Sequence, residues 1–256
     1  MAEPVRGILS PHDLDAVRHR FGVDDEQVRR DHVISHALAA LSTIDSDSVV
    51  FIGGTALSRT HLTELRLSED IDLIGRGSRT EVAREIQDAL VTSLGRAVGV
   101  PRFEPDLAVT RHPASSVMSV RGARVKIQLL NGSEYPQWPT EVRDLEQRYA
   151  DAPPARMRVL TAPAFAAAKL AAWHDRAAPR DLYDLWALAE QGIIDAEAAA
   201  LFGRFGPLTD AARVTFSRRP SDAEWVAALS HQGVLRVGPV EAADVVRRAW
   251  VVAAAS

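Results

Sequence analysis

The sequence predicts an α+β protein in which a mixed α/β half is followed by an α-helical half. Short apolar runs that fit β-strands, such as 48–52 and 124–130, are interleaved with helical apolar periods only in the first part of the chain. The segment Asp151-Ala152-Pro153-Pro154 then breaks the pattern, because proline removes a backbone donor and restricts the residue before it. After one more strand-like run, every segment is helical in pattern. We therefore predict two domains, 1–152 and 153–256.

Capping residues and turn residues set the predicted elements of the first half. Ser10 and Asp24 are good N-caps for two opening helices, and Pro11 suits a first helical position. Arg121-Gly122 and Asn131-Gly132 are typical of turns after strands. The predicted helices are 11–20, 25–41, 55–62, 80–98 and 140–149. The predicted strands are 48–52, 70–74, 103–110, 116–120 and 124–130.

The second half begins with a strand at 156–160, and Thr161 is expected to cap the first of its helices. The predicted helices are 162–174, 179–189, 196–205, 221–232 and 240–253. Trp173 and Trp186 occupy apolar helical positions, which favours packing over base stacking.

Composition excludes several classes of protein. The 256 residues include no cysteine, which rules out disulfides, thiolate metal sites and cysteine nucleophiles. A net charge of −4 means that any nucleic-acid partner must be met by a local basic patch. We find no apolar run long enough to cross a bilayer and no signal-peptide core. We therefore expect a cytoplasmic protein with no membrane partner.

A glycine pair lies where a strand passes into a helix. Gly53 and Gly54 precede a predicted helix start at Thr55. Glycine allows a phosphate to approach the backbone, and the N–H groups and dipole of a helix start favour an anion. Taken alone, the pair is also typical of an ordinary tight turn.

Two carboxylates follow on the next strand. Asp70 and Asp72 lie two residues apart and therefore on one strand face, with Ile71 and Leu73 on the other. Such a pair suits Mg²⁺ or Mn²⁺ held together with substrate phosphates, although it also fits the solvated face of an edge strand. A phosphate cradle beside a metal-binding pair indicates phosphoryl or nucleotidyl transfer.

Arg66 and Ser68 lie just upstream of the carboxylates. Arg66 suits a phosphate and Ser68 could donate a hydrogen bond to one. The alternative for Arg66 is a salt bridge to Glu64 or Glu69.

Two motif blocks resemble a known family. The first is GGTALSR with RLSEDIDL, and the second begins at Lys169 and ends in Arg180-Asp-Leu-Tyr-Asp-Leu185. Together they are similar to the AbiEii/AbiGii-type nucleotidyltransferase toxins, which include the tRNA-modifying MenT group and belong to the DNA polymerase β-like superfamily. The resemblance runs from about residue 25 to 190. It implies a polymerase β-like domain with a mixed sheet, followed by a helical domain that contributes to the active site.

The resemblance also implies site residues. The nucleotide-binding set is Gly53, Gly54, Thr55, Arg66, Ser68, Lys169 and Asp181. The catalytic set is Asp70, Asp72, Lys169 and Asp184, of which Asp70 and Asp72 would bind Mg²⁺ or Mn²⁺. Asp181 or Asp184 could instead orient Lys169 or Arg180. Lys169 is one of only two lysines, with Lys126; its alternative interpretation is a surface lysine at the end of an Ala-rich helix.

One position departs from the superfamily pattern. A third carboxylate is usual on a later strand, where this chain has Gln128, and an amide cannot act as a base. Either Asp184 replaces it or the attacking hydroxyl loses its proton without a protein base.

The resemblance implies a toxin of a toxin–antitoxin system that transfers NMP from an NTP to an acceptor hydroxyl, the tRNA 3′ end in particular, and so inhibits translation and growth. The expected partners are NTP, tRNA and a cognate antitoxin. Two alternatives stay open at this point. One is transfer of NMP to a protein hydroxyl. The other is a catalytically silent NTP-binding module, which is favoured by the amide of Gln128 in place of a carboxylate.

His32 and His36 are four residues apart on a predicted helix. With no third ligand nearby in the sequence, this spacing favours packing over a metal site.

Overall fold

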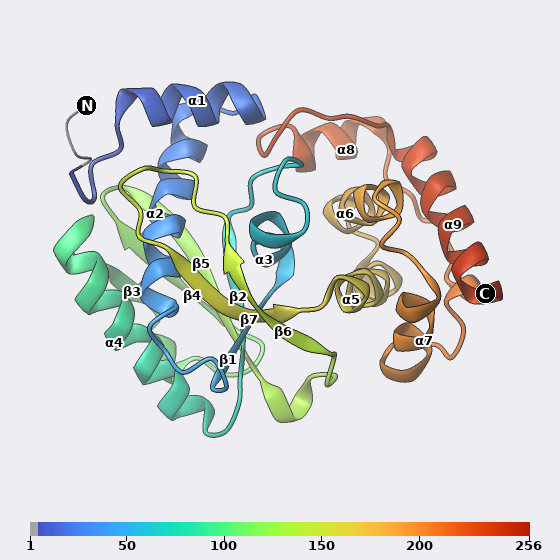
Figure 1. Cartoon of the computed structure of the whole chain (residues 1–256), viewed down its shortest axis with the longest axis horizontal. Coiled ribbons are helices and arrows are strands. Elements are labelled where there is room, and N and C mark those ends of the chain that lie inside the picture. Colours follow the sequence, from blue (N-terminus) through green and yellow to red (C-terminus); the bar gives the residue numbers. More distant parts are fainter. Residues whose placement is uncertain (1–4) are drawn as a thin grey trace. The chain divides into compact units, whose positions relative to one another are not determined.

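The computed structural model describes residues 5–256, which form two compact units. The first unit contains the described residues up to Tyr135 together with Glu141–Val159, and the second contains Pro136–Thr140 and Leu160–Ser256. Each unit is built around its own set of elements, which Figure 1 labels.

A mixed seven-stranded sheet forms the centre of the first unit, in the order β3-β4-β5-β2-β1-β7-β6. β1 is antiparallel to β2 and parallel to β7, and β2 is parallel to β5. The α+β class and the mixed sheet are therefore confirmed. The strands are β1 (Val49–Ile52), β2 (Asp70–Gly75), β3 (Arg102–Glu104), β4 (Ser115–Val120), β5 (Ala123–Asn131), β6 (Thr140–Leu145) and β7 (Ala155–Leu160).

Helices α2 and α4 pack against each other and against the sheet (Figure 1). They cover a face whose side chains at Ile71, Leu73, Ile127 and Leu129 are fully buried. This is the apolar face of β2 and β5, so the side chains of Asp70 and Asp72 point to the opposite face. The helical segments of the first unit are α1 (Pro11–Phe21), α2 (Asp25–Leu41), α3 (Gly53–Thr60), α4 (Arg79–Ala97), η1 (Leu107–Val109) and η2 (Gly132–Glu134).

The two predicted N-caps of the opening helices are confirmed. The side chain of Ser10 accepts a hydrogen bond from the backbone N–H of Asp13, and the side chain of Asp24 accepts one from Gln27. Each bond satisfies a helix N–H that has no partner within the helix.

Two predicted elements are wrong. Residues 140–149 were expected to be helical, but Thr140–Leu145 form strand β6 beside β7 at the edge of the sheet. Backbone pairing with a neighbouring strand overrides the local helix preference of its Glu, Arg and Leu residues. The strand expected at 103–110 ends at Glu104, because Pro105 has no N–H to donate to a neighbouring strand, and Leu107–Val109 form a 3₁₀ turn.

Strand β7 follows the break at 151–154 and pairs with β1, with Val50 opposite Arg158. The first strand after the prolines is thus part of the sheet. The predicted domain boundary between residues 152 and 153 stays a prediction.

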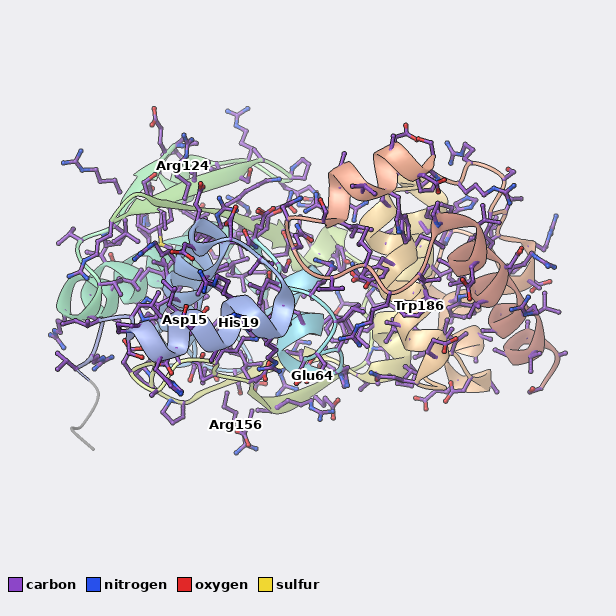
Figure 2. All side chains as sticks on the ribbon, turned by 90° about the horizontal axis from the view of Figure 1, so that it is seen from above. Asp15, His19, Glu64, Arg124, Arg156 and Trp186 are labelled. Atoms are coloured by element: carbon purple, nitrogen blue, oxygen red, sulfur yellow. The ribbon has the colours of Figure 1, made fainter. Side chains whose placement is uncertain are left out.

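The second unit carries helices α5 (Ala162–Arg176), α6 (Pro179–Glu190), α7 (Ala196–Phe205), η3 (Ala211–Arg213), α8 (Asp222–Leu229) and α9 (Pro239–Ala255). Its core contains the nearly fully buried indoles of Trp173, Trp225 and Trp250. Trp186, labelled in Figure 2, is half-buried and stacks on Tyr183 with ring centroids 5.5 Å apart. The tryptophans of α5 and α6 pack among helices, as the sequence predicts.

Within residues 5–256, no helix is both long enough and apolar enough to span a bilayer.

Candidate active site

The glycine pair forms a sharp turn from β1 directly into α3. Gly53 has φ +79°, a left-handed conformation that side chains disfavour. A Cβ added at Gly53 would also lie 2.2 Å from Oδ2 of Asp72, which is far inside van der Waals contact. Both the backbone angle and the neighbouring carboxylate therefore require glycine here. The turn holds Asp72 directly against the backbone at the start of α3.

Two more predicted residues lie beside the second glycine. A Cβ at Gly54 would lie 2.9 Å from Nη2 of Arg66 and 3.0 Å from Oγ of Ser68. Arg66 and Ser68 are both buried, with 3% and 6% of their surface exposed. A buried guanidinium, a hydroxyl and a glycine backbone at a helix start form a set of donors suited to a phosphate.

Asp70 and Asp72 are half-buried on the face of β2 opposite α2 and α4. Two carboxylates on one strand face, beside a turn without side chains, provide the hard oxygen donors that Mg²⁺ and Mn²⁺ take. The residues present therefore fit a divalent cation.

Thr55 has a structural bond within this arrangement. Its side chain is buried, and its hydroxyl donates to the backbone carbonyl of Asp70. The bond fixes the first turn of α3 to the strand that carries the carboxylates.

The register of the sheet places Gln128 directly beside Asp72, and Lys126 beside Asp70. Paired residues on neighbouring strands point to the same face, so Gln128 occupies the position expected for a third carboxylate. Its amide donates to the backbone carbonyl of Pro113. The side chain can hold the loop at Pro113, but it cannot take a proton.

The second unit holds the other predicted residues in one buried cluster. Nζ of Lys169 lies 3.1 Å from Oδ1 of Asp181 and 2.6 Å from Oδ2 of Asp184. Arg176 donates two further bonds to Asp181, at 2.7 and 3.0 Å. Lys169 is only 8% exposed, so its interpretation as a surface lysine is wrong. Both aspartates, not one of them, orient the ammonium group.

The charge of this cluster is balanced by its own members. Burial raises the pKa of Asp181, but the charge of Lys169 and the bonds from Arg176 outweigh burial and hold the pKa below its usual value. Asp181 is therefore an ionised partner for Lys169 rather than a proton donor at neutral pH.

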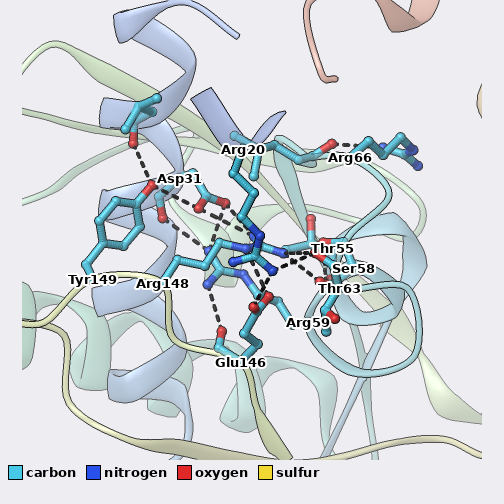
Figure 3. Close-up of polar contacts among 12 residues, drawn as sticks. Arg20, Asp31, Thr55, Ser58, Arg59, Thr63, Arg66, Glu146, Arg148 and Tyr149 are labelled. Atoms are coloured by element: carbon cyan, nitrogen blue, oxygen red, sulfur yellow. Dashed lines mark hydrogen bonds and ion pairs between the residues drawn. The ribbon is translucent and has the colours of Figure 1, made fainter. Parts of the chain in front are cut away.

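Figure 3 shows a buried ionic network next to α3. The sequence alone did not predict this network. Asp31 on α2 accepts bonds from Arg59, Arg148 and Tyr149, at 2.8, 3.2 and 3.0 Å. Arg59 belongs to α3, and Arg148 also donates to the carbonyl of Ser58. The network joins the helix of the glycine turn to α2 and to the chain after β6. The sequence shows a charged residue, Arg59, at the end of the GGTALSR motif, which could have indicated the network. Its partners, however, lie far away in the sequence.

Desolvation, with help from the charge of Arg148, lowers the pKa of Arg59 to about 10, against the attraction of Asp31. Burial raises the pKa of Asp31, but the two guanidinium groups and the phenol of Tyr149 bring it below its ordinary value. Asp31 and Arg59 are therefore both ionised at neutral pH, and each stabilises the buried charge of the other.

His32 and His36 do have a third polar neighbour, contrary to the expectation from sequence. Nε2 of His32 lies 3.0 Å and Nε2 of His36 2.9 Å from Oδ2 of Asp151, which also accepts a bond from Gly7 N at 2.8 Å. Ligand atoms of the three side chains lie within 4.8 Å of one another. These bonds join α2 to the segments before α1 and after β6.

The chain matches known proteins over most of its length. Residues 36–242 match the family model described as nucleotidyl transferase AbiEii toxin, type IV TA system. No curated protein sequence matches. Among solved structures, the chain is similar to MenT4, a nucleotidyltransferase toxin from Mycobacterium tuberculosis H37Rv. That match has a TM-score of 0.69 and 20% identity, and covers 93% of this chain and 88% of MenT4.

A second solved structure, a nucleotidyltransferase described as putative from H. pylori, matches with a TM-score of 0.53 and 14% identity, over 90% of this chain and 95% of that one. At these identities the structural matches show the shared fold, and the family model shows the family. The chain belongs to the AbiEii nucleotidyltransferase toxin family.

Proposed function

We propose that the protein is an Mg²⁺-dependent (or Mn²⁺-dependent) toxin that transfers NMP from an NTP to the 3′ end of tRNA, and thereby inhibits translation and growth until a cognate antitoxin counters it. The observation that carries this proposal is the contact between the Gly53 turn and Asp72. The carboxylate of Asp72, which we assign to the cation, lies directly against a backbone suited to phosphate, and this proximity supports the proposal.

Each residue of the first unit has a defined role in this proposal. Asp70 and Asp72 hold the cation, and the turn at Gly53 and Gly54 accommodates the phosphates with Arg66 and Ser68. Thr55 contributes its backbone to the phosphate site, since its hydroxyl already donates to the backbone carbonyl of Asp70. The bound cation supplies charge stabilisation for the phosphoryl group in transfer.

The reaction forms one bond and breaks one. The acceptor oxygen bonds to the α-phosphorus while the bond from that phosphorus to the bridging oxygen of the β-phosphate breaks, and pyrophosphate leaves. Gln128 cannot take the proton of the acceptor hydroxyl. Asp184 already pairs with the ammonium group of Lys169, with Oδ2 and Nζ 2.6 Å apart, so we do not assign it the role of base. The hydroxyl proton therefore passes to solvent or to pyrophosphate.

Lys169 is assigned to the triphosphate, as the one ammonium in the buried cluster of the second unit. Asp181 and Asp184 position it and are not bases in this scheme. Lysine is a compact charge with three donors, which suits phosphate oxygens that spread around it.

The finer fold assignment is part of the same proposal. The first unit is a polymerase β-like domain, supported by the strand–glycine turn–helix–strand unit that leads to Asp70 and Asp72. The helices after residue 160 form the second domain, and the protein acts in the cytoplasm.

The test is incubation of the purified protein with Mg²⁺, each α-labelled NTP in turn and total tRNA, with Asp70→Ala as the control. Label that enters tRNA with the wild type alone supports the proposal and identifies the base. Label on protein instead of RNA would replace it with NMP transfer to a protein hydroxyl. NTP binding without any transfer would favour the silent module, for which Gln128 beside Asp72 is the supporting observation.

A further inference from the structure

Two adjoining grooves on the second unit are lined by arginines. The first encloses about 450 Å³ between the 212–219 segment and α9, and is lined by Arg213, Arg219 and Arg247 with the hydroxyls of Thr215 and Ser217. A groove of this size accommodates a nucleotide-sized group. Its polar lining is rich in donors.

The second groove shares Arg219 with the first. It is lined by Arg218, Arg219 and Glu224 and reaches Ala177 and Pro179 at the junction of α5 and α6. This junction separates the exposed Arg176 from its partner Asp181, which belongs to the buried cluster that contains Lys169. Through Arg219, the two grooves form a path from that junction to α9.

The segment that carries these arginines is firmly held. Phe216 stacks on Trp173 with ring centroids 5.5 Å apart, and the indole N–H of Trp173 donates to the carbonyl of Thr215 at 3.0 Å. Arg218 donates to the carbonyl of His174 at 3.2 Å. The arginines therefore extend from a fixed backbone, which lowers the entropy lost on binding a ligand.

Most of the positive charge in the grooves is available to a ligand. Arg213 and Arg219 are exposed, and no carboxylate in residues 5–256 lies within ion-pair distance of either. Arg247 is 3.9 Å from Asp244, longer than a charge-assisted hydrogen bond. The lining has four arginines against two carboxylates, Asp244 and Glu224.

We propose that the connected grooves bind the sugar–phosphate backbone of the RNA acceptor. Arginine forks and hydroxyls match phosphate oxygens, and contacts of this kind position a nucleic acid without reading its sequence. Phe216 is buried against Trp173, so the groove offers no exposed ring on which a base would stack. The inference rests on the proposed transfer to RNA and adds the surface that holds the acceptor strand.

The test compares two double variants that each remove two positive charges from the second unit. Arg213→Gln with Arg219→Gln alters the grooves. Arg204→Gln with Arg248→Gln is the control, because both arginines are exposed and neither lines a groove. The affinity of a labelled single-stranded RNA with a free 3′ hydroxyl is measured by fluorescence anisotropy between 50 and 200 mM salt.

The groove variant should lose salt dependence that the control keeps. Each phosphate contact to a single strand contributes about 0.7 to the slope of log affinity against log salt, so two lost contacts lower the slope by about 1.4. Over this fourfold range of salt, the affinity of the wild type should fall about sevenfold more than that of the groove variant. The KM for tRNA in the transfer reaction should rise, with the KM for NTP unchanged.

Equal slopes and affinities for the two double variants would overturn the groove assignment while leaving nucleotide transfer to tRNA intact. RNA that binds through the grooves but receives no label would retain the groove and overturn the transfer proposal. Unchanged RNA binding with lost inhibition by the antitoxin would assign the grooves to an acidic protein partner instead.

Discussion

Replacing Gly53 with alanine should lower the rate of NMP transfer about 100-fold while leaving the protein folded. The new Cβ would lie 2.2 Å from Oδ2 of Asp72, whereas ordinary contact begins at 3.4 Å, so the carboxylate oxygen must withdraw by 3.4 − 2.2 = 1.2 Å. A displacement of about 1 Å at a reacting centre costs about 100-fold in rate. The left-handed backbone adds a stability cost of about 1–2 kcal/mol.

Gly77→Ala is the matched control. Gly77 has φ +90°, and a Cβ there would meet nothing within 4 Å. It therefore carries the same kind of backbone penalty without moving a carboxylate. Urea unfolding should show similar losses for the two variants, and only Gly53→Ala should lose NMP transfer, measured as kcat with a saturating α-labelled NTP. If Gly53→Ala is as active as Gly77→Ala, the position of Asp72 does not govern the reaction.

Three further predictions concern charge. Asp31→Asn should lower the free energy of unfolding, measured in urea at neutral pH, by about 3–5 kcal/mol, because Arg59 and Arg148 are left buried without their shared carboxylate. A loss of about 1 kcal/mol or less would contradict the stabilising role of the network. Burial raises the pKa of Asp181, but Lys169 and Arg176 outweigh burial and hold it below the ordinary value of an aspartate carboxyl. Its stabilising effect is therefore present above that ordinary value and is lost as the pH falls through the folded pKa. The difference in unfolding free energy between wild type and Asp181→Asn should therefore shrink as the solution is acidified below the ordinary pKa of an aspartate carboxyl, and a difference that is constant with pH would refute the pairing with Lys169. EDTA should abolish NMP transfer and added Mg²⁺ should restore it; full activity in EDTA would remove the cation from the mechanism.

The local sequence is sufficient for the centre of the first unit. Alternation at Asp70–Leu73 determines which side chains share a face, and Ile71 and Leu73 are indeed fully buried while the aspartates are not. Capping residues such as Ser10 and Asp24 likewise act within one helical turn. Information of this kind lies within a few residues, because strand and helix periods are properties of the local backbone.

Strand β6 marks the limit of such local information. Its composition is mixed, because Glu, Arg and Leu favour a helix while Thr and Val favour a strand, and its strand conformation comes from pairing at the edge of the sheet. A preference of a few tenths of a kcal/mol per residue is smaller than the gain from satisfying a row of backbone hydrogen bonds.

By itself, the sequence determined the α+β class, the glycine turn, the carboxylate pair and, through motif resemblance, the family. Only the tertiary structure decided that Gln128 lies beside Asp72, that Lys169 is buried between two aspartates, and that Asp31 joins Arg59 to Arg148. Asp31 and Arg148 are 117 residues apart. A buried charge at one of these positions is favourable only when folding brings its partner beside it, away from water. Neighbouring residues in the sequence carry no information about which distant residue that partner is.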